Sequence, residues 1–169
     1  FDHQGSQEKA SQKQLAFDYW QYLKEKRFFV LAPAVFVLPF TMTGIFFYQY
    51  VIADNRGWDA TLYSAFFTGF AIARFIFSLT GGLWVDRMGS PFMYRLYLLP
   101  LLIGIVPFAL IDHIGAALVF LVFSGASMGM SGPVKSSLMA ELYGTEKLGT
   151  VRSLFTMFMV VSTALGPLL

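Results

Sequence analysis

The chain contains no cysteine and little charge for its length. Without Cys among its 169 residues, it can build neither a disulfide framework nor a thiolate metal site. Its two histidines, His3 and His113, lie far apart and share no ligand spacing, so we expect no metal site and no cofactor. Charged residues make up 13% of the chain, whereas 56% is hydrophobic and the mean hydropathy is +0.61. A soluble domain needs far more polar surface, so the composition predicts a multispanning all-α membrane protein.

Motifs of enzymes and of nucleic-acid-binding proteins are also absent from the sequence. No nucleophile–base arrangement, phosphate-binding loop or basic nucleic-acid patch occurs, so neither class of function has support. The many Phe and Met residues are interpreted as core and lipid-facing surface. The chain starts at Phe1 and continues with polar residues instead of an apolar signal segment, so we expect it to be part of a longer protein.

Five apolar segments are each about long enough to cross a bilayer as a helix. They cover residues 28–52, 61–84, 92–111, 115–140 and 150–169, and we expect the last one to be cut short by the chain end. The preceding residues 1–27 are polar and are predicted to form a linker. From Gln14 onward, aromatic and Leu residues recur at helical spacing before a basic end, as Tyr19, Trp20 and Leu23 illustrate. This pattern fits either an interfacial helix on anionic membrane lipid or a plain helical lead-in.

The basic residues between the spans are unevenly distributed. One side of the predicted bundle holds only Arg56, together with Asp54, Asp59 and Asp112. The other side holds Lys9, Lys13, Lys24, Lys26, Arg27, Arg87, Arg95, Lys147 and Arg152. Because basic loops stay in the cytoplasm, the second side, including the linker, is predicted to be cytoplasmic.

A short charged stretch interrupts the apolar sequence between the second and third predicted spans. It reads Gly82-Leu83-Trp84-Val85-Asp86-Arg87-Met88-Gly89, and its adjacent Asp and Arg must lie at the membrane edge. The spacing Gly-x-x-x-Asp-Arg-x-Gly resembles the signature of the major facilitator superfamily, which follows the second and eighth helices of those proteins. The basic pair that usually follows the last glycine is replaced by Ser90 and Pro91.

Other stretches extend this resemblance over nearly the whole chain. Glu141-Leu142-Tyr143-Gly144-Thr145, followed by Gly149-Thr150-Val151-Arg152, resembles the pattern that joins helices ten and eleven. Ala164-Leu165-Gly166-Pro167 is similar to the Gly-Pro element of helix eleven. Five spans that start from the cytoplasm correspond to helices seven to eleven of twelve. The resemblance therefore implies the C-terminal helical bundle of a transporter, with a missing N-terminal half as its partner.

The loop residues are predicted to form a conformational latch at the cytoplasmic edge. Asp86 is expected near the free amides that begin the last helix, around Gly149. Arg87 is expected to pair with Glu141, and Arg152 to join them. The complete predicted latch consists of Gly82, Asp86, Arg87, Gly89, Glu141 and Arg152.

Arg74 is the clearest candidate for contact with substrate. An arginine in mid-span costs about 2.5–3.5 kcal/mol on the insertion scale, so it normally faces a cavity or a partner. Its neighbours on one helical face would permit a close approach or a wet cleft, and phenylalanines lie close beside them. The neighbours are Ala71, Ser78 and Gly81, and the phenylalanines are Phe67, Phe70 and Phe77. In the oxalate–formate and monocarboxylate transporters, which the chain resembles here, a helix-eight arginine holds the substrate carboxylate. A structural ion pair with an acid of the missing half is the alternative.

A polar stripe in the fourth predicted span contains a second cation, Lys135. Ser124, Ser127 and Ser131 precede it at spacings of three and four residues, so all four lie on one helical face. Lys135 with Ser131 and Ser127 is a candidate second substrate contact, whereas a lysine that snorkels to the headgroups is the alternative. In the first span, Thr41, Tyr48 and Gln49 offer hydrogen bonds either to substrate or between helices.

The favoured function is secondary active transport of a small organic anion, such as a mono- or dicarboxylate, by alternating access in the plasma membrane. A coupling proton or counter-anion would accompany the substrate. A drug–proton antiporter of the same superfamily is the alternative, although no span centre carries the protonatable carboxylate that it needs. A receptor or scaffold that does not transport is the competing class. Arg74 and the serine stripe argue against it, because a pure scaffold gains nothing from buried charge.

Overall fold

The computed structural model describes residues 26–168, and for residues 26–30 and 145–147 it describes the backbone without the side chains. Almost all of the linker predicted for residues 1–27, including the stretch expected to form an interfacial helix, lies outside the described residues.

Helices form all the regular structure within residues 26–168, and this part of the chain contains no strand. In chain order the elements are α2 (Lys26–Asn55), α3 (Ala60–Ala65), α4 (Phe67–Met88), α5 (Ser90–Leu96), α6 (Leu99–Leu110), α7 (Gly115–Leu165) and the 3₁₀ turn η1 (Gly166–Leu168). Five helical segments are long and apolar enough to cross a membrane, namely Leu31–Asn55, Ala60–Met88, Ser90–Leu110, Gly115–Gly144 and Leu148–Leu168. The predicted all-α fold with five spanning helices is confirmed.

Both stretches predicted as loops on the basic side are largely helical, which corrects the sequence analysis. Helix α4 continues to Met88, so Gly82, Asp86 and Arg87 lie within it, and Gly89 alone connects it to α5. Likewise α7 comprises two helices that meet at Gly144, whose backbone is not helical, and the first of them extends beyond Ala140 to this bend. A helix satisfies its backbone hydrogen bonds internally, which favours helix up to the membrane edge. Charged side chains in the last turn can still reach water, so they do not force the helix to end.

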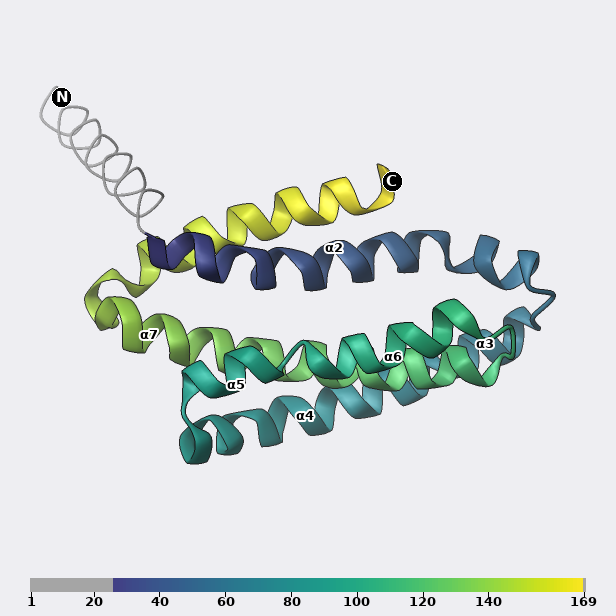
Figure 1. Ribbon diagram of the computed structural model, residues 1–169, viewed down its shortest axis with the longest axis horizontal. Coiled ribbons are helices and arrows are strands. Elements are labelled where there is room, and N and C mark those ends of the chain that lie inside the picture. The colour runs from purple at the N-terminus through teal and green to yellow at the C-terminus, as the bar shows by residue number, and fades with distance from the viewer. Residues whose placement is uncertain (1–25, 169) are drawn as a thin grey trace, which may run out of the picture.

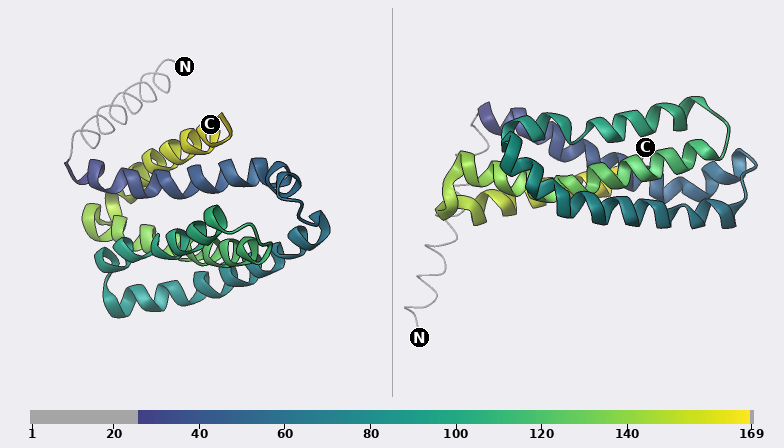
Figure 2. Two further views of the ribbon diagram at one scale, coloured as in Figure 1. Left: turned by 45° about the vertical axis from the view of Figure 1, so that its right-hand side comes forward. Right: turned by 90° about the horizontal axis from the view of Figure 1, so that it is seen from below.

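The bend divides α7 into two parts that belong to different sides of the bundle. We name Gly115–Gly144 the first arm, the residues from Leu148 to Leu165 the second arm, and the bend at Gly144 the elbow. The second arm runs beside α2, whereas α4, α5 and α6 lie beside the first arm (Figure 1). The further views in Figure 2 show the same grouping, with the long helices roughly along one axis.

Very close contact holds α4 against the first arm. A Cβ atom on Gly125 would come within 2.5 Å of the Phe70 carbonyl oxygen, and one on Gly129 within 2.5 Å of the Arg74 carbonyl oxygen. The hydrophobic effect does not drive association of helices inside a bilayer, so close van der Waals packing at small residues contributes much of the association energy. This contact fixes the position of Arg74 relative to the first arm.

Hydroxyl groups join the remaining helices. The Leu101 N–H, in the first turn of α6, donates to Ser127 Oγ at 2.8 Å, and the Ser162 hydroxyl donates to the Phe36 carbonyl of α2 at 2.7 Å. The hydroxyls of Tyr94 and Tyr97 also donate to carbonyls of α2. These bonds satisfy polar groups that would otherwise be buried without a partner in an apolar bundle.

Candidate functional site

The elbow depends on the backbone of Gly144. This residue has φ 75° and ψ 167°, a region of the Ramachandran plot that is essentially restricted to glycine. An apolar cluster from both arms and α2 packs next to the elbow. Its buried members are Leu31, Val35, Leu138, Met139, Val151, Leu154 and Phe155. The sequence therefore fixes the angle between the arms through one glycine and one small core.

A cavity of about 240 Å³, which we name the elbow pocket, opens between the two arms and α2. It is lined by Val35, Ser131, Gly132, Lys135, Ser136, Met139, Arg152, Phe155, Thr156 and Met159. Among the described residues, the lining combines two cations with three hydroxyl groups and contains no acidic residue. Two of the predicted substrate contacts, Lys135 and Ser131, are brought together here.

Arg152 and Lys135 reach the elbow pocket from different arms. Arg152 Nη2 donates to Ser136 Oγ at 3.0 Å, which ties the second arm to the first across the pocket. Lys135 Nζ lies 5.6 Å from the centre of the Tyr97 ring, a cation–π contact. Neither cation forms an ion pair within residues 26–168. Arg152, which the sequence analysis assigned to the latch, is therefore a pocket residue in this structure.

The serine stripe of the first arm divides into two groups. Ser124 and Ser127 are fully buried, and Ser127 accepts the α6 hydrogen bond described above. Ser131 is only partly buried, lines the pocket and donates to the Met128 carbonyl at 2.8 Å. Ser127, predicted to contact substrate, thus joins helices here and does not line the elbow pocket.

Arg74 stands apart from the elbow pocket, at the middle of the span Ala60–Met88. Its residue is exposed, and its side chain makes no hydrogen bond or ion pair within the described part of the chain. The exposed surface of α4 has two stripes at helical spacing. One is apolar, with Ile72, Ile76, Leu79 and Leu83, and the other is small or polar, with Ala71, Arg74 and Ser78, while the exposed Phe75 lies between them. Arg74 thus lies away from the apolar stripe of its helix.

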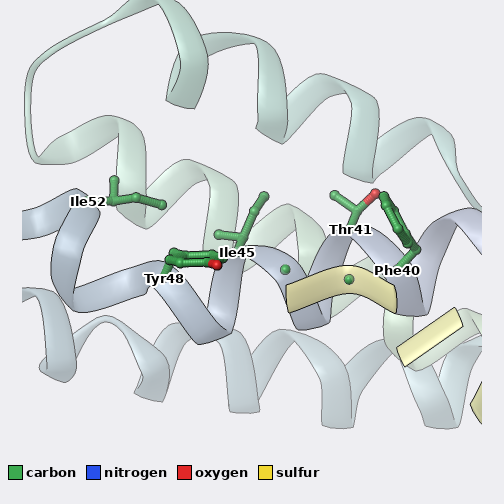
Figure 3. A pocket seen from close by; sticks show the side chains of 7 residues that line it. Phe40, Thr41, Ile45, Tyr48 and Ile52 are labelled. Atoms are coloured by element: carbon green, nitrogen blue, oxygen red, sulfur yellow. The ribbon is translucent and has the colours of Figure 1, made fainter. Parts of the chain in front are cut away.

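A second cavity, a groove of about 530 Å³, runs along α2 and ends at Gly166. Figure 3 shows Phe40, Thr41, Ile45, Tyr48 and Ile52 along this side of α2. The Tyr48 hydroxyl donates to the Pro167 carbonyl at 2.8 Å, so it is engaged between helices. The third predicted contact of this helix, Gln49, does not line the groove, and its buried Oε1 accepts no hydrogen bond.

Comparison with protein families gives the identity of the fold. The model of the Major Facilitator Superfamily matches residues 6–169. The chain belongs to the major facilitator superfamily. Searches among curated proteins and among solved structures found no match. Membership places the chain in a multi-pass membrane protein of a family that transports solutes across membranes.

The superfamily signature occupies the end of α4 nearest the elbow, as the α4–α5 turn in Figure 1 shows. Gly89 has φ 84°, which reverses the chain directly after Met88. Asp86, Arg87 and Glu141 are exposed and form no hydrogen bond or ion pair within the described residues. The predicted cluster of Arg87, Glu141 and Arg152 is therefore not formed in this conformation, because Arg152 binds Ser136 instead.

At the opposite end of the bundle lies a group of contacts that the sequence analysis missed, which we name the Arg56 clasp. Arg56 Nη1 donates to the Phe108 carbonyl at 2.7 Å and, more weakly, to the Ile111 carbonyl at 3.3 Å. Its Nε lies 3.7 Å from Asp112 Oδ1, and its guanidinium lies 5.0 Å from the Trp58 ring centre. The guanidinium thus caps the C-terminal end of α6, where carbonyls lack helical partners. The sequence did contain a signal for this clasp, because Arg56 is the one basic residue predicted on the side of the bundle that carries Asp54, Asp59 and Asp112.

Proposed function

We propose that the chain is part of a secondary active transporter that carries a small organic anion by alternating access. The observation that carries this proposal is Arg74, a permanent charge at the centre of a membrane span. At that depth a guanidinium costs about 2.5–3.5 kcal/mol even on the lenient insertion scale. Such a cost is tolerated when the side chain faces water, a partner or a ligand.

The surface around Arg74 favours a ligand in a cleft over lipid. Ala71 and Ser78 stand beside it, whereas the isoleucines and leucines of α4 form a separate stripe that suits hydrocarbon. The guanidinium stays charged when desolvated, and its planar fork binds a carboxylate through two parallel hydrogen bonds. We propose that this face meets the other helical half of the transporter, with the anion between them.

The elbow pocket supports the same charge preference. Lys135 and Ser131 line it together with Arg152, so a second positive site lies in the membrane region of the first arm. Its volume of about 240 Å³ is below the range of about 300–1,000 Å³ of pockets for drug-sized ligands. The small volume of the pocket therefore favours a small solute. In this proposal, a proton or a counter-anion is the coupled ion.

One observation favours the drug–proton antiporter as a second candidate. The α2 groove, at about 530 Å³, has the size and the largely apolar lining of a drug site. Against it, the acidic residues of the described spans stand near helix ends, as Asp54, Asp86 and Glu141 do. No carboxylate in the described part of the bundle lies where it could exchange a proton at mid-membrane.

Uptake by the complete transporter in proteoliposomes tests the proposal. Arg74→Lys keeps the charge but loses the fork, so the apparent affinity for a carboxylate substrate should fall at least about tenfold. Arg95→Lys, an exposed position near the end of α5, is the matched control and should leave uptake unchanged. Unchanged anion uptake in Arg74→Ala would show that this arginine is structural.

A further inference from the structure

We infer that the elbow pocket binds a small dicarboxylate, with one carboxylate at Lys135 and the other at Arg152. The inference rests on the proposed function, specifies its substrate class, and gives that substrate a second binding position apart from the one proposed at Arg74. It also moves Arg152 from the predicted latch to the group of residues that decide substrate specificity.

The charge balance of the elbow pocket is the first argument. Among the residues whose side chains the structure describes, its lining holds two cations and no acid, and neither cation forms an ion pair with another of these side chains. Two like charges that face one cavity repel each other, and the partly buried Lys135 also loses hydration, whereas Arg152 is exposed. A bound dianion removes both penalties at once, whereas a monoanion leaves one positive charge without a partner.

The hydrogen-bonding groups of the pocket match such a ligand. Ser131, Ser136 and Thr156 add hydroxyl donors around the two cations. Ser136 already holds the Arg152 side chain on the pocket side through the 3.0 Å hydrogen bond, so the guanidinium is oriented before a ligand arrives. Lys135 Nζ lies over the ring of Tyr97, a fully buried side chain, and this cation–π contact orients the ammonium group within the bundle.

The position of the cations on the two arms gives the ligand a mechanical role. Lys135 belongs to the first arm and Arg152 to the second, and the Gly144 elbow lies between them. A dicarboxylate that binds both cations therefore links the two arms across the elbow. A ligand shifts a conformational equilibrium only by its difference in affinity for the two states, and this bridging contact supplies such a difference.

The test compares succinate with butyrate, which has the same carbon count and one carboxylate, in proteoliposomes of zwitterionic lipid that contain the complete transporter. We expect Arg152→Gln to weaken the apparent affinity for succinate about tenfold or more and that for butyrate less than about threefold. Lys135→Gln should weaken both. Arg152→Lys, which preserves the charge, should recover part of the succinate affinity, and Arg95→Gln should match the wild type.

The outcomes separate the two proposals. Equal effects of Arg152→Gln on succinate and butyrate, or no effect on either, would overturn the dicarboxylate site while anion transport stands. Wild-type protein that takes up only neutral or cationic compounds, and no anion, would refute the proposed function itself. Thermal stabilisation of the detergent-solubilised protein by succinate, lost in Arg152→Gln but kept in Arg95→Gln, would support the site without reference to transport. Stabilisation by anionic lipid but not by succinate would assign the pocket to a lipid headgroup and overturn the inference.

Discussion

Replacement of Gly144 by alanine should destabilise the conformation described here. The residue has φ 75° and ψ 167°, and a side chain in that region costs about 1–3 kcal/mol. Apart from the adjacent backbone, no described atom lies within 4 Å of the place where a Cβ would stand, so the cost comes from the backbone conformation. Because both arms and the elbow pocket depend on this bend, the penalty falls on the state that brings Lys135 and Arg152 together.

Thermal unfolding of the purified protein in detergent measures this effect. With about 2–4 °C of Tm for each kcal/mol in a chain of this size, Gly144→Ala should lower Tm by about 2–12 °C. Gly149→Ala is the matched control, because Gly149 is helical, has open space around its Cβ position and lies on the same segment. The control should stay within about 2 °C of the wild type. Equal Tm values for the two variants would refute the argument that the elbow requires glycine.

Three further predictions follow from other parts of the bundle. Arg56→Gln removes a charge-assisted hydrogen bond of 2.7 Å and should lower the free energy of chemical unfolding by about 1.5–3 kcal/mol. Asp112→Asn should lower it by less than about 1 kcal/mol, because the Asp112 side chain is 90% exposed. Equal losses would contradict the Arg56 clasp. Gly129→Ala forces a Cβ to within 2.5 Å of the α4 backbone and should lower the free energy of unfolding by about 1–3 kcal/mol. Gly132→Ala is the control, because its Cβ would meet open space. Equal stability of the two variants would contradict the packing of α4 against the first arm. In whole cells that express a cysteine-free form of the protein, Asn55→Cys and His113→Cys should react with an impermeant thiol reagent added outside. Labelling of Arg95→Cys instead would show that the predicted membrane orientation is reversed.

Hydropathy and length were sufficient to predict the spanning helices, because a bilayer demands long apolar segments and leaves helix as the solution. They could not locate the turns. Asp86 and Arg87 looked like a loop because charges are excluded from hydrocarbon, yet the last turn of a helix reaches water equally well. Gly89 alone reverses the chain there, through its φ of 84°.

The candidate site was only partly predictable for a similar reason. Lys135 and Ser131 were predicted together because they share one face of one helix, and local spacing determines that face. The contact between Arg152 and Ser136 depends on the angle at Gly144, which no periodicity reports. The division of the serine stripe depends on α6, since the Leu101 N–H at the start of that helix takes Ser127 as its acceptor.

The central claim is that this member of the superfamily carries a small organic anion. Counterflow tests it most directly: liposomes that contain the complete transporter are loaded with unlabelled succinate, and the entry of labelled succinate is followed. The account predicts accelerated entry that other small carboxylates inhibit, that organic cations leave unchanged, and that Arg74→Ala abolishes. Counterflow that occurs only with neutral or cationic compounds would contradict it.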